Sequence, residues 1–301
     1  MGSNRPLSRT FIKIAVRLAL GRSRAHAQDW FPGLRLQRAT AVEDGAIWYR
    51  GELVGGLTHS SRAITTGLPR VLIVGSGPSI KRNDLARADD SSCVLLNGAL
   101  HLVPAVISRP LAVAIEDERF VWKHFELVKR TPIGCVCLFS VSVIRAICEL
   151  DRSWLKNRTI LLIDDVRKPY GMPRRDAPEL RKLSAVRLTQ DAATGFCEEP
   201  SIGVFEAGSV VVSAMQFAVS WKPRKIGLLG IDISNADEPR FYEATDKAYS
   251  GIRRAQERII SHLRMARDVA AENGIEIANH SPISALIESG FGYDNTFAKV
   301  E

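Results

Sequence analysis

Short apolar runs alternate with longer mixed segments along most of the chain. Between residues 71 and 279, seven runs of five or six residues are rich in Val, Ile, Leu and Cys and are apolar at consecutive positions. Consecutive apolar positions are typical of parallel strands that helices cover on both faces. The predicted strands are 71–75, 93–97, 111–115, 134–139, 159–164, 226–231 and 275–279.

Longer segments between these runs are predicted to be helices, at 118–129, 141–150, 208–221 and 252–273. Because strands and helices alternate, the predicted fold class is α/β, with a doubly wound, mostly parallel sheet. The segment 165–200 breaks this alternation and is long for a connection. Long loops in compact domains are usually functional or mobile, and we expect the same of this one.

The first 67 residues precede the alternating pattern. They contain a predicted basic amphipathic helix, a predicted hairpin at 44–56 and a polar connector. We therefore divide the chain into an N-terminal extension, residues 1–67, and a Rossmann-like domain, residues 68–301.

Composition narrows the class of protein. Hydrophobic residues make up 46% of the chain and charged residues 25%, which is typical of a folded globular protein. No apolar run approaches the roughly 20 residues of a membrane span. The N-terminus lacks an uninterrupted apolar core with a cleavage site, which argues against secretion. The five cysteines show no paired spacing, which favours free thiols in a reducing cytoplasm over disulfides or a zinc site.

Positive charge is concentrated at the start of the chain, whose overall net charge is +8. The first 30 residues carry one acid, Asp29, and six cations: Arg5, Arg9, Lys13, Arg17, Arg22 and Arg24. The other face of the predicted helix is apolar: Phe11, Ile12, Ala15, Leu18 and Ala19. This pattern predicts a peripheral contact with an anionic membrane surface. The alternative is a basic helix that packs on its own domain. Nucleic acid is not favoured, because no set of stacking aromatics accompanies the basic residues.

The stretch VLIVGSGPSIKRNDL, residues 71–85, predicts a strand, a tight turn and a helix. Such a turn usually faces a phosphate. A dinucleotide fingerprint would need Gly at the position of Ile80, and a Walker motif would need Gly-Lys-Ser/Thr, so both patterns fail. The candidate phosphate-binding residues are Gly75, Ser76, Gly77, Pro78 and Ser79. A plain strand–helix turn remains the alternative.

Later strand ends carry further candidates. Asn97 stands where a NAD-binding unit has an acid, which favours a mononucleotide, although it could simply be a turn residue. Acids at 116–118 follow the third strand and could supply a general base or simply begin a helix. The other candidates are Asp117, Arg119, Gly208, Ser209, Gly230, Asp232, Arg240, Tyr242 and Ser281. His280 is read as a satisfied loop histidine rather than a base.

The ordered set SGPS, LLNGA, EDERF, SIG, GIDIS, RFY and SPIS resembles the lipopolysaccharide-core Kdo transferases of the WaaZ type. The similarity covers roughly residues 70–290. The pieces GSGPSI and LLGIDIS also resemble, more distantly, the bacterial sialyltransferases with a Rossmann-like domain. Both groups use CMP esters of 2-keto-3-deoxy sugar acids.

The resemblance implies a role for each matching residue. The turn 75–79 would approach the CMP phosphate, and Asn97 would hold the cytidine or its ribose. Asp117 and Arg119 would border the sugar. The other matching residues would complete the donor site: Gly208, Ser209, Gly230, Asp232, Arg240, Tyr242 and Ser281. The sialyltransferases use a histidine base before the long helix, where this chain has AYSGIRRAQERIISH, so the resemblance leaves the base open.

The sequence thus predicts a glycosyltransferase that moves Kdo, or a related acid, from its CMP ester to a lipopolysaccharide-core or other lipid-linked glycan. Asp117 is the first choice of base and Asp232 the second. No D-x-D pair ends a strand, so neither a metal nor a cofactor is expected. We expect a cytoplasmic protein, peripheral on the inner membrane. The alternatives are a sialyltransferase-like enzyme with another acceptor, a pyrophosphokinase-like enzyme and a noncatalytic nucleotide-binding protein.

Overall fold

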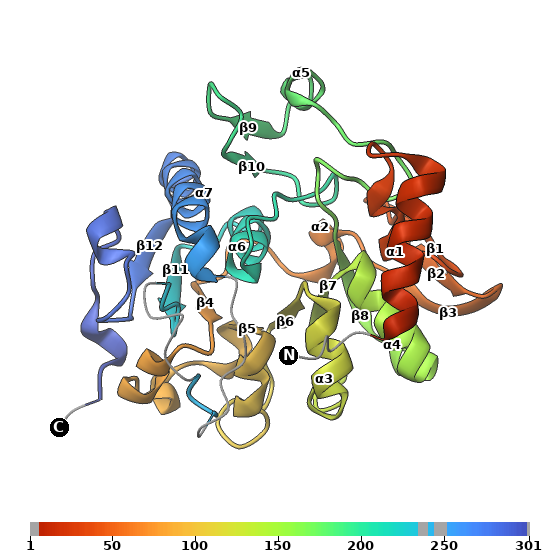
Figure 1. Ribbon diagram of the computed structural model, residues 1–301. Helices are drawn as coiled ribbons and strands as arrows, with labels where there is room; N and C mark the ends of the chain where they lie inside the picture. Colours follow the sequence, from red (N-terminus) through yellow and green to blue (C-terminus); the bar gives the residue numbers. More distant parts are fainter. Residues whose placement is uncertain (1–5, 234–239, 244–251, 300–301) are drawn as a thin grey trace.

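A seven-stranded parallel sheet forms the centre of the protein, whose computed structural model describes residues 6–233, 240–243 and 252–299 (Figure 1). The strand order is β12–β11–β4–β5–β6–β7–β8, and in Figure 1 β12 lies at the left and β8 at the right. The strands are β4 (Arg70–Val74), β5 (Cys93–Leu96), β6 (Ala112–Ile115), β7 (Val136–Ser140), β8 (Thr159–Ile163), β11 (Lys225–Leu229) and β12 (Glu276–Asn279). The predicted α/β class and all seven predicted strands are confirmed, with boundaries within two residues.

Helices cover both faces of the sheet. They are α3 (Glu118–Val128), α4 (Val141–Asp151), α6 (Val210–Ser220) and α7 (Ile252–Glu272). Successive side chains of a strand point to opposite faces, so the consecutive apolar residues of β4 feed two cores. Val71 and Ile73 pack in the core that includes α6 and α7, whereas Leu72 and Val74 pack in the core that includes α3 and α4. The four predicted helices are confirmed.

The segment after β4 differs from the prediction. In place of an α-helix it forms three short 3₁₀ helices at Pro78–Arg82, Leu85–Arg87 and Asp90–Ser92. The side chains of Asp84 and Asp89 each accept a hydrogen bond from the backbone N–H two residues later. Asp side chains that bond the nearby backbone in this way compete with a continuous helix.

The N-terminal extension packs against the β8 edge of the sheet. It contains α1 (Leu7–Leu20), α2 (Ser60–Ala63) and an antiparallel sheet of β1 (Leu34–Gln37), β2 (Gly45–Tyr49) and β3 (Glu52–Leu57). The predicted hairpin is confirmed, and β1 adds a strand that was not predicted. Apolar side chains of this small sheet, such as Ile47 and Val54, belong to the same core as β4. Extension and main sheet therefore share one core.

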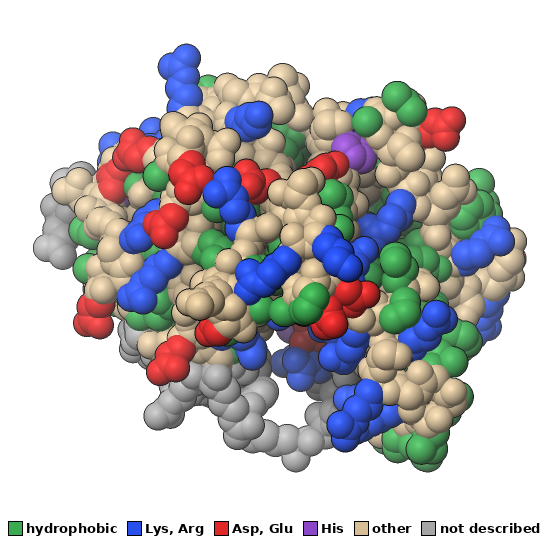
Figure 2. All heavy atoms as spheres, turned by 90° about the horizontal axis from the view of Figure 1, so that it is seen from above, with side chains coloured by type: hydrophobic (Ala, Val, Ile, Leu, Met, Phe, Trp, Pro, Cys, Tyr) green, Lys and Arg blue, Asp and Glu red, His purple; other side chains and the backbone are tan. Residues whose placement is uncertain are grey.

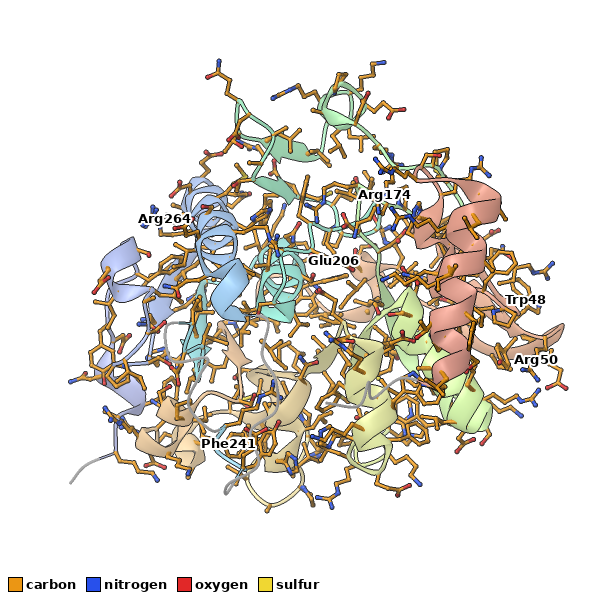
Figure 3. All side chains as sticks on the ribbon, in the orientation of Figure 1. Trp48, Arg50, Arg174, Glu206, Phe241 and Arg264 are labelled. Atoms are coloured by element: carbon orange, nitrogen blue, oxygen red, sulfur yellow. The ribbon has the colours of Figure 1, made fainter. Side chains whose placement is uncertain are left out.

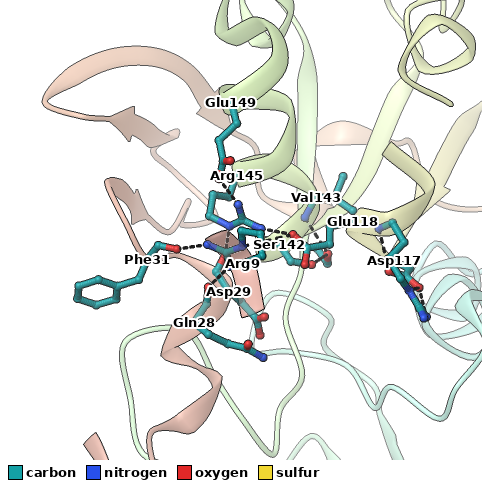
Figure 4. A network of polar contacts seen from close by, with 12 residues as sticks. Arg9, Gln28, Asp29, Phe31, Asp117, Glu118, Ser142, Val143, Arg145 and Glu149 are labelled. Carbon is teal, nitrogen blue, oxygen red and sulfur yellow. Dashed lines mark hydrogen bonds and ion pairs between the residues drawn. The ribbon is translucent and has the colours of Figure 1, made fainter. Parts of the chain in front are cut away.

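Helix α1 packs through a face that includes Arg9, which is only 5% exposed. Its guanidinium donates to the carbonyl oxygens of Gln28 and Phe31 and lies 4.0 Å from the carboxylate of Glu118 (Figure 4). The prediction of an exposed basic face was therefore wrong for Arg9, because two carbonyls and a nearby carboxylate hold this cation inside the protein. Arg5 lies outside the described residues.

The segment 165–200 has a structure of its own. It contains α5 (Ala177–Arg181) and the two-stranded ribbon β9 (Val186–Leu188) and β10 (Gly195–Cys197). The segment packs around a small hydrophobic core of its own, formed by Val166, Leu180, Cys197 and Phe205. The segment is thus an ordered cap rather than an irregular loop.

All five cysteines are free and buried, as predicted. Burial raises the pKa of the Cys93 thiol to about 12, so this thiol is neutral at physiological pH. Within the described part of the chain, no helix is both long enough and apolar enough to cross a membrane.

Candidate active site

The turn at 75–79 lies where the carboxyl ends of β4 and β11 meet. The chain leaves these two neighbouring strands toward opposite edges of the sheet, which makes this point a topological switch. A Cβ atom on Gly75 would stand 2.4 Å from the carbonyl oxygen of Gly230, and one on Gly77 would stand 2.4 Å from the carboxylate of Asp232. Both glycines are therefore needed for the close approach of two strand ends.

An internal carboxylate occupies the donors of this turn. The N–H and the hydroxyl of Ser79 each donate to a carboxylate oxygen of Asp232 at 2.7 Å, and the Ser79 hydroxyl also lies 2.7 Å from that of Ser281. Asp232 is 7% exposed. The Ser79 donors predicted to bind a phosphate thus already bind an anion of the protein. The predicted roles of Ser79 and Asp232 in binding and catalysis stay predictions, and the geometry gives both residues a structural role.

The segment 240–243 lies over the carboxyl ends of β4 and β5. The N–H of Phe241 donates to the carbonyl of Ser76 at 3.3 Å, and the ring of Tyr242 stacks on His101 at 4.1 Å. The Tyr242 hydroxyl accepts a hydrogen bond from Arg240 at 2.9 Å. These contacts bring Arg240 to the same cavity wall as Asn97.

A cavity of ≈ 410 Å³, which we call the central cavity, lies at the carboxyl ends of β5 to β8. Six of the predicted site residues line it: Asn97, Asp117, Arg119, Gly208, Ser209 and Arg240. They come from four separate parts of the chain, and the parallel strands bring them to one edge of the sheet. The remaining predicted residues lie outside this cavity wall. The turn at 75–79 contacts Gly230, Asp232 and Ser281, and Tyr242 belongs to the segment 240–243.

Asn97 is the clearest ligand-binding candidate in the cavity wall. Its backbone is left-handed, with φ 43°, a conformation that Asn tolerates better than most residues. Its side-chain oxygen is buried and accepts no hydrogen bond from the described residues. Such an acceptor is costly unless a ligand or a water molecule donates to it.

Glu116 has the position and the contacts that a general base would need. It follows β6 directly, lines the central cavity and accepts a hydrogen bond from the Ser213 hydroxyl at 2.7 Å. Burial, together with the nearby charge of Asp165, outweighs this hydrogen bond and raises the pKa of Glu116 to about 7. A base whose pKa lies near the working pH is well matched to proton transfer.

The pKa values of two neighbouring carboxyl groups, Asp165 and Glu206, are shifted in opposite directions. Burial would raise the pKa of Asp165, but Arg167 and Lys168 hold it below its usual value. Burial and the charges of Glu116 and Asp165 raise the pKa of Glu206 well above its usual value. The shift favours the neutral form of Glu206 and so opposes the build-up of negative charge in a cavity lined by six carboxyl groups.

Asp117, the predicted base, lies at the mouth of the same cavity with a different set of contacts. It is the N-cap of α3, where it accepts from the N–H of Arg119 at 2.9 Å, and it also forms an ion pair with the Arg119 guanidinium. Its side chain is 37% exposed. Catalysis by Asp117 stays a prediction, and its contacts alone give the residue a structural role as a helix cap.

Sequence reasoning missed Asp165, Lys168 and Glu206 and gave Glu116 no role of its own. The sequence did contain an indication for Asp165, because this acid directly follows a predicted strand, as the acids after β6 do. Glu206 had none, because it precedes α6 in an irregular stretch (Figure 3). Among the described residues, no group of three or more His, Cys, Asp and Glu side chains could hold a metal ion.

No family model matches the chain. The human vacuolar protein sorting-associated protein 8 homolog is 27% identical over 143 residues, 46% of this chain, and the match spans only 10% of that protein. The sialyltransferase CstII from Campylobacter jejuni, solved with CMP-3FNeuAc, is 12% identical with a TM-score of 0.40, over 78% of this chain and 90% of that one. The MAf glycosyltransferase from Magnetospirillum magneticum AMB-1 is 13% identical with a TM-score of 0.45, over 95% of this chain and 37% of that one.

Proposed function

We propose that this protein is a glycosyltransferase that moves a 2-keto-3-deoxy sugar acid, Kdo, from its CMP ester to a lipid-linked glycan. The observation that carries the proposal is the convergence of the motif residues. Asn97, Arg119, Ser209 and Arg240 lie far apart in the sequence and line one polar cavity at the carboxyl ends of parallel strands. Ligands of open α/β sheets bind at this edge.

The cavity offers a partner for each part of the donor. The side-chain oxygen of Asn97 would accept from the cytosine amino group. Gly208 and Ser209 precede α6, and Ser209 makes no side-chain cap, so the first N–H groups of this 11-residue helix would face the phosphate. Arg119 or Arg240 would pair with the sugar carboxylate.

Glu116 would remove the proton of the acceptor hydroxyl as that oxygen attacks the anomeric carbon of the sugar. The bond from this carbon to the phosphate oxygen breaks, and CMP leaves with the electron pair. Orientation of the donor and stabilisation of the departing phosphate supply the rest of the catalysis.

A thermal-shift panel of CMP, CDP, UDP, ATP and NAD tests the nucleotide. We expect CMP to raise the melting temperature, because a ligand at 100 times its Kd stabilises the folded state by about 2.7 kcal/mol. A response to NAD or ATP without one to CMP would refute the proposal. A panel of CMP-Kdo and CMP-sialic acid then separates the two donor sugars by product formation.

An exposed stripe of α1 supports association with an anionic membrane surface at the cytoplasmic side of the inner membrane. Leu7 is 78%, Phe11 72% and Leu18 81% exposed, and Ile14 lies on the same face. Lys13 and Arg17 are also exposed on this helix. An apolar stripe beside cations fits an interface of anionic headgroups and acyl chains.

Vesicle co-sedimentation tests the stripe. We expect Phe11→Glu combined with Leu18→Glu to lower binding to phosphatidylglycerol vesicles by about 100-fold or more, because burial of each side chain contributes about 1.5–3 kcal/mol. The matched control is Val42→Glu, which is 81% exposed and outside α1. Equal binding by the wild type and the double variant would exclude α1 as the contact.

A further inference from the structure

A second cavity, of ≈ 480 Å³, adjoins the central one, and we call it the basic cavity. Both cavities are lined by Glu116, Lys168, Glu206 and Gly208. The basic cavity is otherwise lined by four arginines: Arg167, Arg174, Arg175 and Arg258. Figure 2 shows Lys and Arg side chains at the edge of a hollow in the face seen from above.

Three of these arginines form no ion pair with any carboxylate of the described residues. The guanidinium of Arg175 donates to the carbonyl of Val166 at 3.0 Å, and that of Arg258 donates to the carbonyl of Ala207 at 2.9 Å. Arg174 is exposed (Figure 3). Backbone carbonyls thus orient Arg175 and Arg258 without neutralising them, which leaves guanidinium donors for an anion.

Gly208 allows Arg258 to approach the start of α6. The residue has φ +94°, and a Cβ atom there would stand 2.8 Å from the Arg258 guanidinium. The positive end of the α6 dipole adds to the charge of the arginines. A side chain at this position would be strained by the positive φ and would clash with both Arg258 and Ala255 as they stand.

We propose that the basic cavity binds a phosphate or carboxylate group of the acceptor glycan. The inference rests on the proposed function, with the donor in the central cavity. Glu116 lies in the wall common to both cavities, which is where a base must be to reach a hydroxyl of a substrate held on one side and a donor held on the other. Planar guanidinium groups match the two oxygens of a carboxylate or phosphate. The acceptor is therefore an anionic sugar.

The test uses the whole protein and inorganic phosphate, with acetate as the carboxylate probe. Calorimetric titration gives the Kd of each anion for the wild type, for the double variant Arg174→Gln/Arg175→Gln and for the control Arg181→Gln, which lines neither cavity. We expect the double variant to bind the preferred anion at least about tenfold more weakly, because each hydrogen bond to a charged group is lost. The control should match the wild type, and all three proteins should respond equally to CMP.

Anion binding and the response to CMP together separate failure of the inference from failure of the proposed function. An unchanged anion Kd in the double variant overturns the inference. Loss of the CMP response together with the anion response also overturns it, because the cavity would then hold the donor phosphate. If CMP stabilises none of the three proteins and the double variant alone loses the anion, the proposed function fails and the anion site stands.

Discussion

Replacing Glu116 by Gln is expected to lower kcat for sugar transfer by about 10²–10⁴, the usual contribution of a general base. Gln has the same shape and can still accept from the Ser213 hydroxyl, whose bond to Glu116 is 2.7 Å long. It cannot take the acceptor proton. CMP should therefore stabilise the variant as much as the wild type, so that the loss lies in the chemical step.

Asp117→Asn is the matched control, one residue further along the chain. Asn is also a good N-cap, and the ion pair to Arg119 is partly exposed, so we expect a change in kcat of only a few fold. A large loss in Asp117→Asn with a small one in Glu116→Gln would return the role of base to Asp117, as the sequence predicted.

The pH profile gives an independent readout. Burial raises the pKa of Glu116 to about 7, and only the deprotonated carboxylate can accept a proton. The value of kcat/KM should therefore rise with pH between about 6 and 8 and level off above, and Glu116→Gln should remove this limb. A profile that is flat down to pH 5 would exclude Glu116 as the base.

Replacing Arg145 by Met is expected to lower the free energy of unfolding by about 3 kcal/mol, the lower end of the range for breaking a buried ion pair, because the carboxylate of Glu118 loses its nearer cation and keeps the more distant Arg9 at 4.0 Å. Arg145 has a side-chain exposure of 0%; it pairs with Glu118 and Glu149, and its Nε donates to the carbonyl of Asp29 at 3.0 Å (Figure 4). Met fills a similar volume, so the loss reflects the polar contacts. Denaturant unfolding measures it.

Arg152→Met is the control for this measurement. Arg152 directly follows α4 and pairs with Glu52, but its side chain is 43% exposed. Exposed pairs contribute about 0–1 kcal/mol, so this variant should unfold nearly like the wild type. Equal unfolding free energies for both variants would show that the Arg145 network does not stabilise the fold.

The pattern of the sequence determined the sheet and its helices. Runs such as VLIV at 71–74 are apolar on both faces, and only a strand covered on both sides buries every residue of such a run. The convergence of Asn97 and Asp117 followed from the same rule, because parallel strands place their carboxyl ends at one edge. The local pattern therefore carried the fold and the general position of the site.

Tertiary contacts decided what each polar group does. Nothing in GSGPS indicates that Asp232, 153 positions away from Ser79, binds the donors of Ser79. Nothing in α1 indicates that Arg9 is buried against Glu118 while Phe11 is exposed. Glu116 and Asp117 are adjacent and chemically alike, but one lies in a desolvated wall and the other caps a helix at the cavity mouth. Burial, charge and hydrogen-bond partners come from segments distant in sequence, and they set the protonation and availability of a side chain, so only the folded structure separates these roles.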